Sequence, residues 1–89
     1  MKKKRERLEV VHDILDTVQK RRKIGPTRLL QLSNLSPQMF REYMEDLTQA
    51  GLLDERDEDG RKKYVSTDKG DRFLQEYRVF ANFVDQLGL

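Results

Sequence analysis

The chain has 89 residues, of which 36% are hydrophobic and 38% are charged, a composition that allows one domain with a small core. It has no cysteine, one histidine and no apolar run near the roughly 20 residues of a membrane span, so we expect no disulfide, no metal, no cofactor and no membrane partner. The net charge of +2 is unevenly distributed, because residues 1–44 hold 11 Lys and Arg against 5 Asp and Glu whereas residues 45–89 hold 7 against 11, and this asymmetry is compatible with a nucleic-acid partner.

The N-terminal segment 1–7 is basic. Its Lys3 and Lys4 could lie on phosphates or could only keep the terminus soluble. A helix is predicted from residue 4 to residue 22, because its apolar residues recur at helical spacing. These residues are Leu8, Val11, Ile14, Leu15 and Val18. His12 flanks this stripe and is expected to pack rather than to do chemistry. The basic cluster at residues 19–23 either complements the helix dipole as solvated charge or contacts phosphate.

Ile24-Gly25-Pro26 should break this helix, and Ile24 could form one extended residue that pairs with a later hairpin. A short helix is expected over residues 26–33, with three leucines, Leu29, Leu30 and Leu32, as its apolar residues. Leu35 lies in the turn that follows, which is natural if the turn caps a core. A second helix after so tight a turn indicates a helix-turn-helix, in which the second helix is the recognition helix.

That second helix is predicted over residues 37–50 by its boundary signals. Ser36 is a good N-cap, Pro37 suits the first helical position, and Gly51 can adopt the left-handed conformation that stops a helix. Its two faces differ in polarity. The core face would carry Phe40, Tyr43, Met44 and Leu47, and the polar face Gln38, Glu42, Glu45 and Gln49, with Arg41 on its flank. Such a helix is either a recognition helix or an ordinary amphipathic surface helix.

Two extended runs, separated by residues 57–60 with an Asp-Gly turn, predict a β-hairpin over residues 52–66. Tyr64 and Val65 favour strand. Thr67 is the expected N-cap of a last helix, with Asp68 in its first turn.

The last helix is predicted over residues 68–87 and carries a heptad-like apolar seam. The seam consists of Phe73, Tyr77, Phe80, Val84 and Leu87, widened by Leu74, Ala81 and Phe83. A domain of this size has little left to cover the distal half of the seam, so we expect it to pair with the same helix of a second chain. The alternative is that the helix folds back onto its own domain.

The order helix, helix, turn, helix, hairpin, helix is that of a winged helix, so the predicted fold class is mainly α with a small β-hairpin (α+β). Several motifs share the register of a known pattern: Thr27-Arg28-Leu29-Leu30, Asn34-Leu35-Ser36, Tyr43, Leu47, Gly51-Leu52-Leu53 and Thr67-Asp68-Lys69-Gly70. Over residues 5–80 the chain resembles the archaeal winged-helix regulators, notably the ten-kilodalton archaeal chromatin-type DNA-binding proteins. The resemblance implies a homodimer built by a C-terminal antiparallel coiled coil, although the helix here is shorter. The expected division is a winged helix-turn-helix domain at 1–70 continuous with a dimerisation helix at 71–89.

The expected function is binding of double-stranded DNA by a cytoplasmic, nucleoid-associated protein or transcriptional regulator. The recognition helix would enter the major groove and the wing would lie near the backbone, because a winged helix docks in this way. The candidate DNA-binding residues are Lys3, Lys4, Arg28, Ser36, Gln38, Arg41, Glu42, Arg61, Lys62 and Lys63. The candidate dimer interface consists of Phe73, Tyr77, Phe80, Phe83, Val84 and Leu87.

Some residues oppose this interpretation. Glu42 and Glu45 would repel phosphate, and the acidic wing tip at residues 57–59 should stay away from DNA. A winged helix used for protein contacts is therefore the alternative. RNA is a weaker one, because the A-form major groove does not admit a helix. An enzyme is not expected, since the sequence shows no nucleophile–base–orienter set and no Gly-rich phosphate loop.

Overall fold

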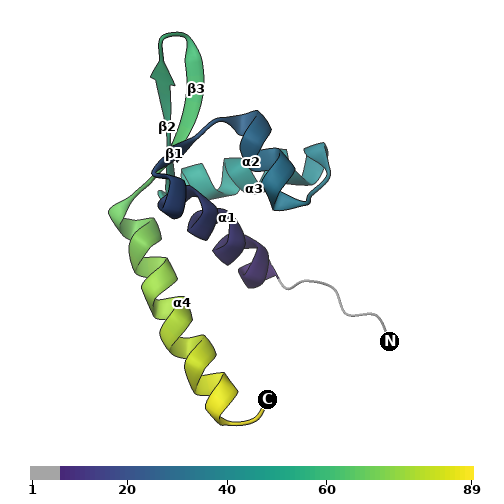
Figure 1. Ribbon diagram of the computed structural model, residues 1–89, viewed down its shortest axis with the longest axis vertical. Helices are drawn as coiled ribbons and strands as arrows, with labels where there is room; N and C mark the ends of the chain where they lie inside the picture. The colour runs from purple at the N-terminus through teal and green to yellow at the C-terminus, as the bar shows by residue number, and fades with distance from the viewer. Residues whose placement is uncertain (1–6) are drawn as a thin grey trace.

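In a computed structural model, the described residues 7–89 form four helices and a three-stranded sheet (Figure 1). The order is α1 (Arg7–Arg21), β1 (Lys23–Ile24), α2 (Pro26–Ser33), α3 (Pro37–Gln49), β2 (Leu53–Glu58), β3 (Arg61–Ser66) and α4 (Asp68–Gln86). This is the predicted winged helix fold, mostly helical with a small sheet. None of the described helices has the length and apolar character needed to cross a membrane.

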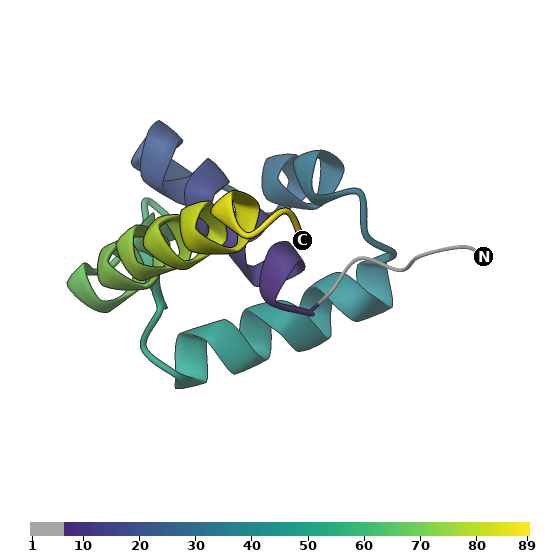
Figure 2. The same ribbon diagram turned by 90° about the horizontal axis from the view of Figure 1, so that it is seen from below.

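The core gathers around α1, which contacts α2, α4 and β3. Seen from below, α1 lies between α3 on one side and α4 on the other (Figure 2). The predicted stripe is confirmed at Val11, Ile14, Leu15 and Val18, all buried. Leu8 was predicted wrongly, because it is 59% exposed, and Val10 is buried in its place. The first turn of α1 therefore directs a different side to the core than the helical spacing alone indicated.

The sheet is antiparallel with strand order β1-β3-β2, and β1 confirms the predicted pairing of Ile24, which lies opposite Tyr64. The predicted Asp-Gly turn of the hairpin is confirmed, and the strand before it is two residues longer than predicted. Asp57 and Glu58 belong to β2, and only Asp59 and Gly60 form the turn, with φ of 53° and 78°. Positive φ at both central residues is the type I′ geometry that matches the strand twist. The wing is therefore a regular two-residue hairpin.

Helix α4 begins at the predicted N-cap. The Thr67 hydroxyl accepts a hydrogen bond from the Gly70 N–H at 2.9 Å and donates one to the Gly51 carbonyl at 2.8 Å. Lys69 Nζ donates to the Ala50 carbonyl at 2.7 Å, beside the left-handed Gly51 that ends α3. These contacts fix the first turn of α4 against the end of α3.

Beyond this junction α4 extends away from the domain (Figure 1). Leu74 is fully buried in the core, which agrees with the expectation that the domain leaves only the distal half of the apolar seam uncovered. Phe73 packs against the core, and the Tyr77 ring stacks on His12 with centroids 4.4 Å apart, which agrees with a packing role for His12. Phe80, Phe83 and Leu87 are exposed. The apolar residues in the first half of α4 therefore pack against its own domain, whereas most of those in the second half are exposed.

Candidate nucleic-acid interface

The turn between α2 and α3 is held by its own hydrogen bonds. Asn34 takes the left-handed conformation with φ of 63° and ends α2. The buried Ser33 hydroxyl donates to the Leu30 carbonyl at 2.8 Å and accepts from the Leu35 N–H at 3.3 Å. The Ser36 hydroxyl caps α3 by accepting from the Met39 N–H at 3.2 Å. Leu35 packs against the core, so the turn fixes the angle at which α3 leaves α2.

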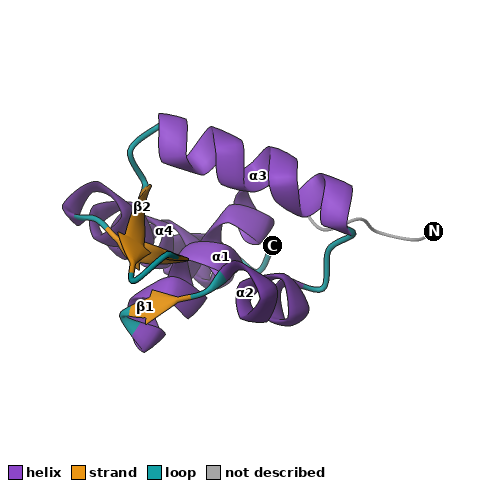
Figure 3. Ribbon diagram, turned by 90° about the horizontal axis from the view of Figure 1, so that it is seen from above, coloured by secondary structure: helices purple, strands orange, loops and turns teal. Residues whose placement is uncertain are grey.

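Helix α3 lies at the edge of the molecule, with the other elements on one side of it only (Figure 3). The predicted core face is confirmed, because Phe40, Tyr43, Met44 and Leu47 are buried. The predicted polar face is exposed, and it includes Gln38, Arg41, Glu42 and Glu45. Gln38 Nε2 lies 3.5 Å from Glu42 Oε2, a long and weak contact that leaves the Gln38 amide able to turn toward another partner.

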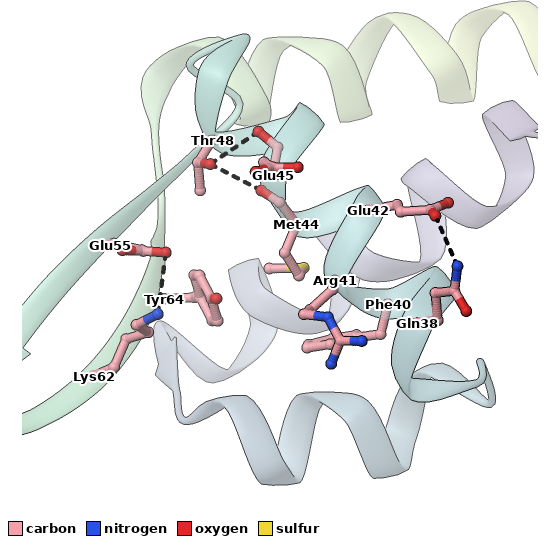
Figure 4. Close-up of a pocket in the computed structure, with 10 residues that line it drawn as sticks. All are labelled: Gln38, Phe40, Arg41, Glu42, Met44, Glu45, Thr48, Glu55, Lys62 and Tyr64. Carbon is pink, nitrogen blue, oxygen red and sulfur yellow. Dashed lines mark hydrogen bonds and ion pairs between the residues drawn. The ribbon is translucent and has the colours of Figure 1, made fainter.

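An open groove of about 540 Å³ separates α3 from the wing. Figure 4 shows Glu55, Lys62 and Tyr64 directed from the wing toward α3. The opposite wall carries polar and apolar side chains of α3, namely Gln38, Phe40, Arg41, Glu42, Met44, Glu45 and Thr48. The groove contains three carboxylates and two cations, so its charge is slightly negative.

The Lys62 ammonium lies 3.5 Å from Glu55 Oε2 across the hairpin. Burial raises the pKa of Tyr64 above its ordinary 10.0, and the neighbouring Glu55 carboxylate adds to that rise. Tyr64 is therefore a neutral phenol at neutral pH and forms the floor of the groove. Arg41 is the one groove cation for which the described residues provide no ion pair.

The three basic residues of β3 do not share one face. Side chains alternate along a strand, and the buried Tyr64 shows which side faces the core. Lys62 lies on that inner side, whereas Arg61 and Lys63 lie on the outer side. The structure thus divides a set that the sequence suggested would act together.

The remaining candidates lie elsewhere. Ser36 is exposed at the start of α3, and Arg28 is exposed on α2, where its Nη1 lies 3.4 Å from Gln31 Oε1. Lys3 and Lys4 lie outside the described residues. The structure therefore brings Gln38, Arg41, Glu42 and Lys62 together in one groove.

One contact between α1 and α3 was not predicted from the sequence. Arg7 Nη2 donates to Asp46 Oδ2 at 2.8 Å, and its guanidinium lies 5.0 Å from the centroid of the Tyr43 ring. The Asp46 hydrogen bond is the main reason that the pKa of Arg7 is raised. The two residues are 39 positions apart, so no local pattern in the sequence could have revealed the pair.

The distal half of α4 forms a second candidate surface. Leu8 of α1 and the seam residues Tyr77, Phe80 and Val84 line an apolar groove of about 490 Å³. Leu8 is exposed beside these α4 residues and extends their apolar surface onto α1. Within the described residues, no group of three or more His, Cys, Asp or Glu side chains is placed to hold a metal ion.

The chain was compared with known proteins. A sequence-family profile described as "Winged helix-turn-helix" matches residues 4–84. The crystal structure of Sso10a-2, a DNA-binding protein from Sulfolobus solfataricus, is similar with a TM-score of 0.78 and 26% identity, over 93% of this chain and 85% of that one. The crystal structure of SSV1 F-93 is similar with a TM-score of 0.69 and 23% identity, over 89% of this chain and 88% of that one. No curated protein sequence matches the chain significantly.

Proposed function

Because the chain belongs to the winged helix-turn-helix family, we propose that it binds double-stranded DNA with α3 in the major groove. The observation that carries the proposal is the exposed polar face of a recognition helix whose angle is fixed by a capped, hydrogen-bonded turn. The similarity to Sso10a-2, which is a DNA-binding protein, supports it.

The groove residues divide into base contacts and backbone contacts. Gln38 can pair with the adenine edge and Arg41 with the guanine edge, each through two hydrogen bonds. The Ser36 hydroxyl accepts from the Met39 N–H, so its own O–H remains available to a phosphate near the first turn of α3. Arg28 on α2 and Lys62 on the wing are further proposed phosphate contacts, with Lys3 and Lys4 as an additional N-terminal arm.

The carboxylates of the groove limit the affinity. Glu42 and Glu45 are exposed on α3, and either would repel a phosphate that came close. Glu42 could instead accept a hydrogen bond from the cytosine amino group, which would make it a specificity contact. We therefore propose moderate affinity with about four to six phosphates contacted by each chain.

We further propose that the protein acts as a homodimer, as a transcriptional regulator or a nucleoid-associated protein in the cytoplasm. The exposed seam of α4, together with Leu8, is the proposed contact between two copies. Phe73 and Tyr77 also pack within their own chain, so Phe80, Phe83, Val84 and Leu87 would contribute most of the new contact. In the proposed division, residues 1–70 bind DNA and residues 71–89 join the two chains.

Fluorescence anisotropy with random-sequence duplexes at low salt tests the DNA proposal. We expect log K to fall with log salt at a slope of about −4 to −5. Selection from random duplexes on the same protein would measure specificity. Absence of binding to every duplex at low salt, or an affinity independent of salt, would contradict the proposal.

The second candidate is a winged helix used for protein contacts. The observation that favours it is the surplus of carboxylates over cations in the groove between α3 and the wing. In this case the groove would take a basic peptide, and no duplex would bind at low salt. The anisotropy experiment separates the two functions directly.

A further inference from the structure

The outer side of the sheet carries a cluster of cations that the proposed readout by α3 does not use. We call it the outer wing face, and define it as the sheet surface opposite Tyr64. Its cations are Lys23, Arg56, Arg61 and Lys63, and its carboxylates are Asp54 and Glu58. The end of α1 leads directly into β1 at the base of the wing (Figure 1).

The two carboxylates of this face are already engaged. Glu58 accepts hydrogen bonds from Lys23 Nζ at 3.0 Å, and Asp54 Oδ2 lies 3.5 Å from Arg56 Nε. Among the described residues, no ion pair involves Arg61 or Lys63. The face therefore has cationic side chains that remain available to an anion from outside.

The register adds a second, independent observation. Arg56 lies directly opposite Lys63 in the β2–β3 pairing. Like charges directly opposite each other destabilise a sheet. The two charged pairs nearer the hairpin turn are favourable, because Asp57 lies opposite Lys62 and Glu58 lies opposite Arg61. The unfavourable pair lies on the outer wing face, where Asp54 at 3.5 Å neutralises Arg56 in part, and an anion bound beside Lys63 would reduce the remaining repulsion.

The base of the face is also held in place. Arg22 takes a left-handed conformation with φ of 70°, and its N–H donates to the Gln19 carbonyl at 3.3 Å. Lys23 is fixed both by the strand pairing and by its bond to Glu58. An anion that binds here meets cations on an ordered backbone, so less conformational entropy is lost on binding.

We propose that the outer wing face binds the phosphodiester backbone of a second duplex, separate from the duplex that α3 reads. This inference rests on the proposed DNA-binding function. In the proposed readout the first duplex would lie on the groove side of the sheet with Lys62, whereas Arg61 and Lys63 lie on the opposite side. Arg61 suits phosphate in particular, because a guanidinium can donate two parallel hydrogen bonds to phosphate oxygens.

The experiment is an NMR titration of the ¹⁵N-labelled full chain with a duplex of about one helical turn, roughly 12 base pairs. We expect two phases. Amides of α3 shift first, and amides of Lys23, Arg61 and Lys63 shift when duplex is added beyond the first equivalent. The double variant Arg61→Gln/Lys63→Gln should keep the first phase and weaken the second, and the salt slope of the weakened second phase should be smaller in magnitude by about 1.8 for two lost phosphate contacts.

Two controls make the result specific. The variant Arg72→Gln/Arg78→Gln removes the same charge from α4 and should keep both phases. Poly-glutamate should not reproduce the second phase, because its carboxylates lack the spacing of a duplex backbone. An equal response to poly-glutamate would overturn the assignment to phosphodiester.

The outcomes distinguish this inference from the proposed function. Saturation at the first equivalent with no shift on the outer wing face would overturn the inference and leave readout by α3 intact. Shifts on the outer wing face alone would overturn readout by α3 and retain the phosphate surface. No shift on either face would overturn both.

Discussion

Gly70 lies against the carbonyl oxygen of Leu52 so closely that a methyl group on its Cα would overlap that oxygen. The contact joins the first turn of α4 to the residue that leads from α3 into the wing. Thr67 and Lys69 bond to the carbonyls of Gly51 and Ala50 at the same place. The position of the wing relative to the recognition helix thus depends on a glycine in the first turn of another helix.

We expect Gly70→Ala to lower the free energy of unfolding by about 1–3 kcal/mol or more, because the added methyl group must displace backbone rather than a flexible side chain. The matched control is Gly25→Ala. At Gly25 the nearest atom to an added Cβ is the flexible end of Lys63 at 3.8 Å, and the backbone φ is −78°. Chemical denaturation of both variants is the measurement, and an equal loss in the two would show that the Leu52 contact is unimportant.

The elements themselves could be predicted from the sequence because their signals are local. Ser36 and Thr67 are caps, and Gly51 has the positive φ expected of a helix stop. The pairing of Ile24 with the hairpin was also predicted, because Gly25 and Pro26 break the helix and leave Ile24 as an extended residue. The exposed face of α3 followed from helical periodicity alone.

The remaining features of the fold and of the candidate site depend on how the helices and strands pack and on contacts between residues far apart in the sequence. A heptad pattern does not show by itself what covers a helix, and the burial of Val10 in place of Leu8 was not visible in the helical spacing of α1. The alternation of side chains along a strand already separates Lys62 from Arg61 and Lys63, but the sequence does not show which of the two faces lies toward the core. The burial of Tyr64 identifies the inner face, and of these three cations only Lys62 lies on it.

Base recognition by Gln38 predicts a change in specificity without a change in general affinity. Gln38→Ala should reduce discrimination at one base position by about 1–3 kcal/mol and leave the salt slope unchanged, because the amide contacts a base edge and carries no charge. Gln49→Ala is the control, since Gln49 is an exposed glutamine at the other end of α3. Selection from random duplexes measures both, and an unchanged preferred sequence for Gln38→Ala would remove this residue from the readout.

The buried phenol of Tyr64 predicts a loss of stability at alkaline pH. Burial and Glu55 raise its pKa in the folded chain above 10.0, so the unfolded chain releases the proton first as the pH rises. The stabilisation is present below pH 10 and is lost as the pH rises through the folded pKa. Thermal unfolding between about pH 9 and about pH 11 should show a shallower decline for Tyr64→Phe than for the parent. Parallel curves would contradict this assignment.

The distal seam of α4 predicts the oligomeric state. Phe80 is 64% exposed on the seam, and Asn82, two positions further along α4, is exposed on the side of the helix away from the seam. Phe80→Glu should dissociate the dimer, because a carboxylate in an apolar interface loses hydration without gaining a partner. Asn82→Glu should leave it intact, since that position stays in water. Sedimentation equilibrium of the parent and both variants measures this, with circular dichroism to confirm that each remains helical. A monomeric parent would refute the dimer, and dissociation by Asn82→Glu alone would place the interface on the opposite face of α4.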